Sequence, residues 1–511
     1  MRRGGLSPAH GTARRRRRFS TLHTVALAAI LALAAFLRFY DLGEESLWED
    51  ELMSLTFVSA EGARGVVEFV DTSDVHPPLY YLVLHYSRAL FGESEAALRL
   101  PSVVAGLLAV GVVYLLGRRL YSRAEGLAAA LLVAVAWWPI YYSQDARSYS
   151  FLLLLSALSA FFWWGCFGRL KERPGRFPPW EAVGYVACAA ALCYTHYFGV
   201  LLVALQGAAL LALAPRSALR TALLYGAVGL LYLPWIPKLF SDSGGEAWFG
   251  RPRISFLEEF VTDVFGRSLL LTILCTFLLT LGAQRAWARG GGPLSGGPNS
   301  RGLSGLLGRL LPGGLLIAWF AVPVLLAFAI SLAWTPIFYP RNLTICLPAA
   351  FLLLARSLVL LSGRFWPTST SALAALFLAQ LVFGIGYYER LDKEQFRATA
   401  RYAASYAGPE TAFVHSGWGG WYEERYPDRF DYYFERFGAP EGPGQAVDSP
   451  QDVQAALKRF EAEGKSRLVY VRAHVDKPPV RRALVKEFGP PTKRGQFSDP
   501  NAPRVLVFEK R

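Results

Sequence analysis

Residues 100–143 read LPSVVAGLLAVGVVYLLG, then RRLYSRAE, then GLAAALLVAVAWWPIYYS. The two outer segments are apolar runs of 18 residues, and the segment between them holds three arginines and one glutamate. A helix of this length can cross about 30 Å of hydrocarbon. A basic segment between two such runs is typical of a cytoplasmic turn, because Lys and Arg are enriched on the inner side of membranes. The stretch therefore predicts a membrane hairpin.

Further apolar runs extend this pattern to about residue 390. The whole chain of 511 residues is 53% hydrophobic and only 18% charged, whereas soluble proteins contain about 25% charged residues. A twelfth run, residues 79–91, is short and carries His85 and Arg88, so we expect a helix in the membrane interface there. We predict an α-helical polytopic membrane protein with about eleven transmembrane helices, near residues 21–38, 100–117, 126–143, 148–167, 180–197, 198–214, 218–236, 267–284, 313–334, 343–361 and 370–388.

Charge predicts the orientation of these spans. With the N-terminus inside, the basic segment 1–20 with its run Arg14–Arg18 and the Gly- and Pro-rich linker 290–313 are cytoplasmic. The first external loop, residues 39–99, then holds twelve Asp or Glu against three Arg. Counting 79–91 as a span would place the later basic segments outside, which disagrees with the positive-inside rule. We expect a multi-pass protein of the cytoplasmic membrane.

The composition changes after residue 390. Residues 390–511 carry 21 basic and 17 acidic side chains, a net charge of +4, and helix-like patterns alternate there with short apolar strands. This predicts a small α/β domain outside the membrane, after a transmembrane module at 21–389. Its Trp418 and Trp421, in a Gly-rich stretch, are interpreted as core aromatics of a turn rather than carbohydrate contacts.

Neither nucleic acid nor a disulfide framework is indicated. Of the formal net charge of +14, +10 belongs to residues 1–389, where many basic residues mark cytoplasmic segments. The charge therefore reports orientation more than a nucleic-acid partner. All five cysteines lie in apolar runs, where thiols behave as small hydrophobic groups.

Ionisable residues gather at the predicted outer face. The acidic triplet Glu49–Glu51 follows Trp48 just outside the first span. It has two interpretations: a solvated acidic turn or helix N-terminus, and a general base at the membrane surface. Several ionisable groups at one membrane face are costly unless they line a cavity. The gathering therefore favours a site, with candidates at His76, Asp145, Arg147, His196 and Arg341.

Four motifs occur in an order that resembles a known family. They are SLWEDE at 46–51, HPPLYY at 76–81, ALRLPS at 97–102 and YSQDARSY at 142–149. Together they resemble the GT-C membrane glycosyltransferases, which include protein O-mannosyltransferases and the aminoarabinose transferases of lipid A. The resemblance covers roughly residues 20–390 and leaves the C-terminal domain almost unmatched.

The resemblance implies transfer of a sugar from a polyprenyl-phosphate donor to a lipid, glycan or protein acceptor outside the cytoplasmic membrane. Asp50 and Glu51 match the family's catalytic pair, so Asp50 would take the proton of the attacking acceptor hydroxyl, with inversion at the sugar. Arg147 and Arg341 would neutralise the leaving phosphate. His76, Asp145 and His196 would orient the sugar or the acceptor.

No cofactor is expected to be required. A sugar linked through one phosphate does not demand a metal. Because His76 or His196 could bind a divalent ion together with a carboxylate, such an ion stays an alternative. Two other functions stay open: a secondary transporter, and a polysaccharide ligase or polymerase with a lipid-linked donor. The transporter is disfavoured because the charges gather at one face and no internal repeat is evident.

Overall fold

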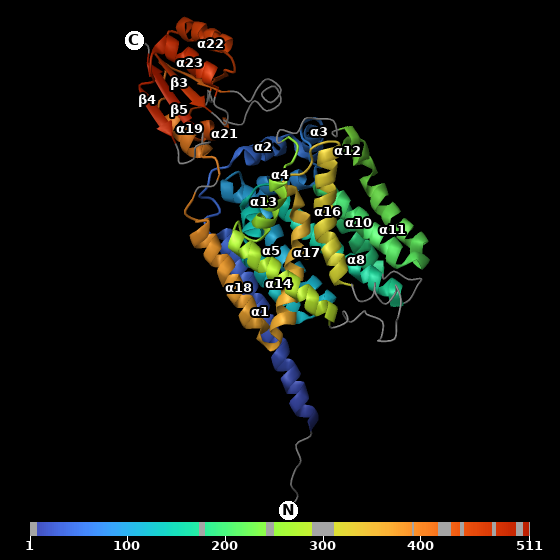
Figure 1. The fold of residues 1–511 in the computed structure, drawn as a ribbon. Coiled ribbons are helices and arrows are strands. Elements are labelled where there is room, and N and C mark those ends of the chain that lie inside the picture. Colours follow the sequence, from blue (N-terminus) through green and yellow to red (C-terminus); the bar gives the residue numbers. More distant parts are fainter. Residues whose placement is uncertain are drawn as a thin grey trace, which may run out of the picture. The chain divides into compact units, whose positions relative to one another are not determined.

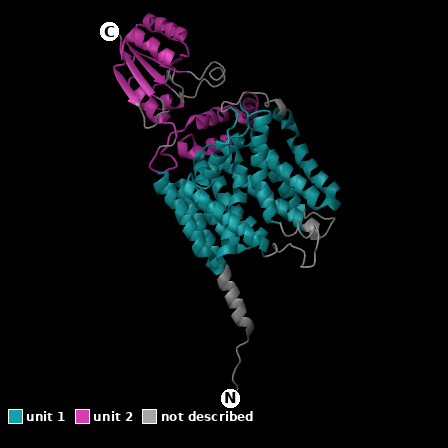
Figure 2. Cartoon of the chain, viewed as in Figure 1, with its two compact units in different colours: residues 1–40, 74–83, 99–386 teal, residues 41–73, 84–98, 387–511 magenta. Residues whose placement is uncertain are grey.

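The structure is a computed structural model, which describes residues 8–172, 179–241, 250–288, 311–390, 393–416, 431–439, 444–472, 477–496 and 504–509. The chain divides into two compact units (Figure 2). Unit 1 comprises residues 1–40, 74–83 and 99–386, and unit 2 comprises residues 41–73, 84–98 and 387–511. The first external loop is thus shared between the units, and most of it groups with the C-terminal domain.

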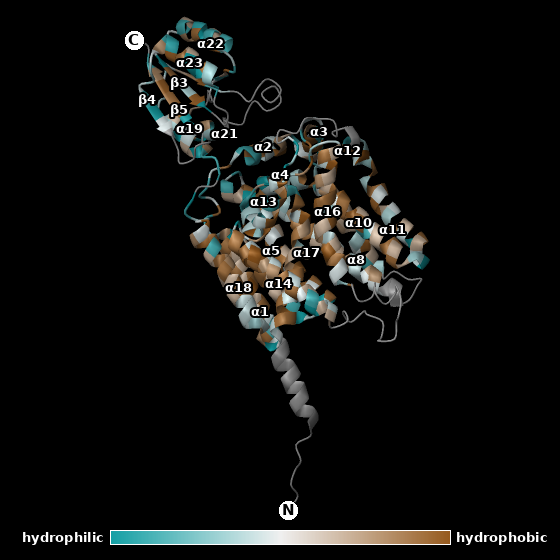
Figure 3. Cartoon of the chain, viewed as in Figure 1, coloured by the Kyte–Doolittle hydropathy of each residue, from teal (hydrophilic) through white to brown (hydrophobic). Residues whose placement is uncertain are grey.

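Unit 1 is a bundle of apolar helices, drawn brown along most of their length in Figure 3. Small residues allow some helices to pack closely: a Cβ at Gly126 of α6 would lie 2.6 Å from the Tyr114 carbonyl oxygen of α5. The helical elements that lie wholly or mostly in this unit are α1 (Pro8–Phe39), α5 (Glu95–Leu120), α6 (Arg123–Val135), α7 (Trp137–Tyr141), η1 (Tyr142–Gln144), α8 (Tyr149–Glu172), α9 (Pro179–Thr195), α10 (Phe198–Leu213), η2 (Pro215–Ser217), α11 (Ala218–Tyr232), η3 (Leu233–Trp235), α12 (Ile236–Ser241), α13 (Ser255–Val264), α14 (Leu269–Ala288), α16 (Gly313–Ala333), η5 (Pro340–Cys346), α17 (Leu347–Ser362), η6 (Gly363–Phe365), α18 (Trp366–Ala379) and η7 (Gln380–Gly384) (Figure 1).

Within the described residues, seven helical runs are long and apolar enough to cross a membrane. An eighth is added if α6 and the α7–η1 segment, bent by 63° at their junction, form one span. The run Pro340–Gly384 holds α17 and α18, which match two predicted spans, and α9 and α10 match two more with shorter helices. The chain is therefore a multi-pass helical membrane protein. The number eleven and the orientation stay predictions.

A buried arginine stabilises the bent span. The break between α6 and α7 leaves the last carbonyls of α6 without helical partners. The Arg38 guanidinium, fully buried, donates to the carbonyls of Val133 and Ala134 at 3.1 and 3.0 Å and to Ser143 Oγ at 3.1 Å. Gln144 Nε2 in turn donates to the Arg38 carbonyl at 3.1 Å. These bonds fix the chain that leads from α7 to Asp145 and Arg147.

Unit 2 begins with short helices of the first external loop. The loop helices are α2 (Glu49–Val58), α3 (Gly62–Ser73) and α4 (Leu79–Phe91). The helix α4 has the bounds predicted for the interfacial segment, and its first residues belong to unit 1. Those of the C-terminal domain are α19 (Phe396–Ala404), α21 (Asp431–Arg436), α22 (Pro450–Ala462) and α23 (Pro478–Phe488).

The C-terminal domain contains a five-stranded sheet with the order β2-β1-β3-β5-β4. β1 is parallel to β2 and β3, and β5 is antiparallel to β3 and β4. Val453 and Phe460 of α22 and Leu484 of α23 pack with the strands into one apolar core. The strands are β1 (Thr411–His415), β2 (Gln445–Ala446), β3 (Arg467–Arg472), β4 (Lys493–Gln496) and β5 (Arg504–Glu509).

The predicted small α/β domain is confirmed, although its orientation to the membrane is not tested. Three predicted features lie outside the described residues: most of the linker 290–313, the pair Trp418 and Trp421, and the side chains of Arg14–Arg18. The boundary predicted at residue 390 stays a prediction, because the two compact units divide the chain differently.

Candidate active site

Asp74 is the centre of a buried polar cluster in unit 1. Its Oδ1 lies 3.0 Å from His76 Nδ1, and its Oδ2 accepts a short 2.5 Å hydrogen bond from the Tyr81 hydroxyl. Arg147 donates to that hydroxyl at 3.2 Å. Burial would raise the pKa of Asp74, but the charge and hydrogen bond of His76, with Arg147 and Tyr81, lower it well below its ordinary value. Asp74 is therefore an ionised carboxylate that orients His76.

The motif at 142–149 places Asp145 and Arg147 between η1 and α8. Both side chains are buried, Asp145 completely. Ser102 of α5 donates to the Arg147 carbonyl at 3.1 Å, which ties the ALRLPS motif to this segment. Two of the four motifs thus meet at one arginine, whose guanidinium also contacts the HPPLYY motif through Tyr81.

His196 lies in the turn between α9 and α10, and it is 4% exposed. Its Nδ1 accepts from the Phe198 N–H at 3.2 Å, so the proton of the neutral ring lies on Nε2. The Asn342 side chain lies near the His196 ring, but Nε2 makes no hydrogen bond of normal geometry with a described residue. Its ring centroid lies 5.1 Å from that of His76.

Arg341 enters the same cluster from η5, a segment that packs against α8. Its guanidinium lies 4.9 Å from the ring centroid of Tyr339 and 5.7 Å from that of Tyr149. Arg341 and Arg147 are both close enough to His196 to act on it electrostatically. The structure therefore brings together five residues of unit 1, all but Asp74 predicted from sequence: Asp74, His76, Arg147, His196 and Arg341.

The predicted catalytic pair lies in unit 2. Asp50 and Glu51 are in the first turn of α2, so the local structure is an acidic helix N-terminus, where carboxylates are favoured. The turn is not simply solvated. Glu51 is 1% exposed, with Oε1 3.3 Å from Lys393 Nζ and Oε2 accepting from the Trp48 N–H at 3.3 Å.

Sequence reasoning missed Asp74, Tyr81 and Lys393. Asp74 lies two residues before the HPPLYY motif and Tyr81 is its last residue, so their proximity to His76 was a usable signal. Lys393 gave no local signal, because its partner Glu51 is far away in the sequence.

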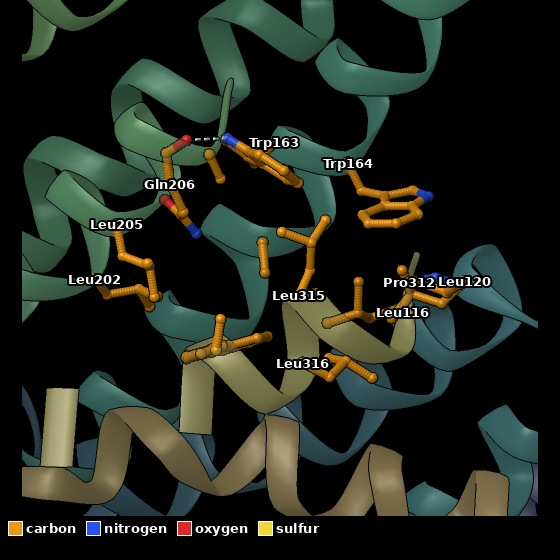
Figure 4. A pocket seen from close by; sticks show the side chains of 14 residues that line it. Leu116, Leu120, Trp163, Trp164, Leu202, Leu205, Gln206, Pro312, Leu315 and Leu316 are labelled. Carbon is orange, nitrogen blue, oxygen red and sulfur yellow. Dashed lines mark hydrogen bonds between the residues drawn. The ribbon is translucent and has the colours of Figure 1, made fainter. Parts of the chain in front are cut away.

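A second feature of unit 1 is an apolar cavity of about 480 Å³, including its open side (Figure 4). Its walls come from α5, α8, α10 and α16 with Pro312, and Trp163 donates to the Gln206 carbonyl at its edge. None of its lining residues is ionisable, which distinguishes this cavity from the polar cluster around Asp74. In the part of the chain that the structure describes, no group of three or more His, Cys, Asp or Glu could hold a metal. Independence from metals stays a prediction.

Comparisons with known proteins show what this chain is similar to. Residues 75–240 match the family described as dolichyl-phosphate-mannose-protein mannosyltransferase. A curated relative, the undecaprenyl phosphate-alpha-4-amino-4-deoxy-L-arabinose arabinosyl transferase 1 of Pseudomonas fluorescens, is 28% identical over 229 residues. That match covers 42% of this chain and 40% of the relative, so it spans less than half of the relative's length.

Two solved structures match almost the whole chain. ArnT from Cupriavidus metallidurans in the apo state gives a TM-score of 0.58 at 15% identity, over 95% of this chain and 98% of that one. The same protein bound to undecaprenyl phosphate gives 0.56 at 15% identity, over 94% and 97%. At this identity the likeness shows the fold. The chain is a multi-pass membrane protein with the GT-C fold, and the resemblance predicted from its motifs is confirmed.

Proposed function

We propose that the chain is a glycosyltransferase that moves a sugar from a polyprenyl-phosphate donor to an acceptor on the outer face of the cytoplasmic membrane. The observation that carries this proposal is the cluster of Arg147, Arg341 and the two histidines in unit 1. Two guanidinium groups around a buried histidine suit a phosphate, because guanidinium pairs with two phosphate oxygens at once. The matched relative is named for an undecaprenyl phosphate-linked sugar, and one matched structure holds undecaprenyl phosphate.

In this proposal the anomeric carbon–oxygen bond of the donor breaks and its electron pair stays on the phosphate. Arg147 and Arg341 stabilise the negative charge that develops on that leaving group. His76, fixed by ionised Asp74, and His196 orient the sugar or the acceptor through their Nε2 atoms. Asp145 is assigned an orienting role with them.

Asp50 is proposed as the general base, with Glu51 as its partner in the motif. It takes the proton of the acceptor hydroxyl while that oxygen attacks the anomeric carbon. Attack from the face opposite the phosphate inverts the configuration of the sugar. The assignment follows the likeness of SLWEDE to the family's pattern, and the position of Asp50 in the first turn of α2 favours a carboxylate electrostatically.

A transfer assay tests the proposal. Purified protein in nanodiscs receives synthetic undecaprenyl phosphates that carry a radiolabelled hexose or pentose, with a membrane extract as the acceptor source. We expect label in the acceptor fraction from one donor, and loss of at least about 10²-fold in Asp50→Asn. Uptake of label into sealed vesicles without new glycosidic bonds would instead identify a transporter. Extension of a polymer without a separate acceptor would identify a polymerase.

The proposed orientation has its own test. Alkaline phosphatase fused after residue 511 is expected to be active outside the membrane, and a fusion within the linker 290–313 is expected to be inactive there. The reverse pattern would contradict an external C-terminal domain.

A further inference from the structure

A short segment after the last helix of unit 1 lies along the acidic turn, and both belong to unit 2. The Arg397 N–H donates to Ser46 Oγ at 3.0 Å, and its guanidinium donates to the carbonyls of Gly43 and Glu44. Further along, the Glu49 N–H donates to Glu394 Oε2 at 3.2 Å. Residues 393–397 therefore run beside residues 43–51, and hydrogen bonds at several points fix their register.

Lys393 makes the most buried contact of this segment. Its ammonium lies 3.3 Å from Glu51 Oε1, and the two side chains are 1% and 0% exposed. The Gln395 amide donates to the Lys393 carbonyl at 2.8 Å, which holds the backbone of the lysine in place. An ion pair removed from water this completely is costly to break, because either partner alone would remain as a buried charge.

The C-terminal domain adds a second anchor through α21. The Tyr433 hydroxyl accepts from the Leu47 N–H at 2.8 Å and donates to Glu95 Oε1 at 3.1 Å. Glu95 also pairs with Arg397 at 2.9 Å and with Arg436 at 3.1 Å. The entry to α2 is thus held by two segments of the C-terminal domain, residues 393–397 and α21.

We propose that Lys393 is a positioning residue for the acidic turn of α2, and that the C-terminal domain acts as a brace for this turn. This inference rests on the proposed role of Asp50. Successive residues of a helix point about 100° apart, so fixing Glu51 by Lys393 also fixes the direction in which the adjacent Asp50 side chain leaves the backbone. Lys393 acts through Glu51 and needs no contact with the sugar or the phosphate.

The inference assigns a role to a domain that the four sequence motifs do not include. If the brace only stabilised the fold, its loss would affect binding and turnover together. If it positions Asp50, its loss lowers kcat and leaves binding of the lipid phosphate by Arg147 and Arg341 unchanged.

The test compares Lys393→Met and Lys393→Arg with Lys465→Met, a matched control in the same domain whose ammonium contacts the Pro409 carbonyl in an exposed position. Hydrogen–deuterium exchange reports on residues 47–52 without any substrate, and binding of undecaprenyl phosphate reports on unit 1. We expect faster exchange of residues 47–52 in Lys393→Met, recovery in Lys393→Arg, and no change in Lys465→Met. Undecaprenyl phosphate binding should stay within about twofold of the unsubstituted chain.

With a donor that supports transfer, kcat of Lys393→Met should fall by about 10²-fold at nearly constant donor KM. Where Lys393→Met does not fold, the double variant Lys393→Met/Glu51→Gln, which leaves no buried charge, replaces it for the exchange and lipid-phosphate measurements only, because Glu51 belongs to the proposed catalytic pair. Unchanged exchange at residues 47–52, or parallel losses of kcat and lipid-phosphate binding, would overturn the inference. Full transfer by Asp50→Asn would instead overturn the proposed base, whatever the exchange shows.

Discussion

The imidazole rings of His76 and His196 lie edge to face with centroids 5.1 Å apart, although one follows α3 and the other separates α9 from α10. Each ring uses Nδ1 for a contact with the protein: His76 with Asp74, and His196 with the Phe198 N–H. This leaves the Nε2 atoms as the ring nitrogens that can meet a substrate. The pair therefore defines the centre of the candidate site in unit 1.

Arg341 should govern affinity for the donor phosphate. Its guanidinium lies near the rings of Tyr149 and Tyr339, within the same cluster as the two histidines. We expect Arg341→Ala to weaken binding of undecaprenyl phosphate by about 10- to 100-fold, as for loss of a charge-assisted contact. Arg341→Lys should recover only part of it, because an ammonium lacks the planar fork. Isothermal titration or microscale thermophoresis measures both.

Arg364 provides the matched control for this prediction. Its guanidinium also lies over an aromatic ring, 4.7 Å from the ring centroid of Phe365. Arg364 is, however, in a segment between two predicted spans that is predicted to be cytoplasmic. Arg364→Ala should bind undecaprenyl phosphate like the unsubstituted chain. Equal losses in the two variants would show that binding follows general charge rather than this site.

Asp74 should contribute stability that depends on pH. Because its pKa is lowered in the folded state, its ionised form stabilises the fold above its ordinary pKa, about 3.9. That contribution is lost as the pH falls below about 4 towards the folded-state value. We expect Asp74→Asn to unfold at a lower temperature than the unsubstituted chain by a constant margin between about pH 5 and 8. The margin should shrink below about pH 4 in thermal unfolding followed in detergent. A margin that grows on acidification would contradict this assignment.

Gly106 should be required for the close approach of α5 to the bent span. A Cβ at this position would lie 2.1 Å from Ser143 Oγ and 3.2 Å from Arg38 Nε. Gly106→Ala is therefore expected to destabilise the fold by about 1–3 kcal/mol, as overpacking does. A Cβ at Gly111 of the same helix would meet no heavy atom within 4 Å, so Gly111→Ala is the control and should be neutral or slightly stabilising. Denaturation midpoints of the two variants test the difference.

Much of the fold follows from local sequence patterns. The interfacial helix at 79–91 and the strand after residue 466 were predictable because apolar spacing and flanking prolines or polar turns define them. The strands β2 and β4 were not, because β2 pairs only two residues and β4 reads Lys-Arg-Gly-Gln. The 63° bend within residues 126–143 was missed for a related reason: its stabilising Arg38 comes from another helix.

The candidate site was predictable where ionisable residues interrupt apolar runs. Arg147, His196 and Arg341 are such residues, and the structure gathers them. Asp74 stood in a loop already rich in acids, so composition did not distinguish it. Lys393 could not be found from sequence, because a buried ion pair with Glu51 depends on how distant segments of unit 2 pack.

Glu95 should stabilise unit 2 far more than an exposed ion pair does. It is 3% exposed and accepts hydrogen bonds from Arg397, Arg436 and Tyr433. Glu95→Gln removes the charge that both arginines share. Because these arginines are partly exposed, water replaces some of the lost interaction, and we expect a destabilisation of about 2 kcal/mol rather than the larger cost of a fully buried pair.

The matched control is Glu68→Gln, which breaks the exposed pair with Arg64 one helical turn away. Such pairs contribute about 0.3–0.5 kcal/mol. Unfolding midpoints and exchange of residues 43–51 should therefore change in Glu95→Gln and stay nearly constant in Glu68→Gln. Similar small effects in both would mean that Glu95 does not hold the C-terminal domain to the first external loop. Removal of a buried carboxylate shared by two arginines should destabilise the fold more than removal of one exposed ion pair.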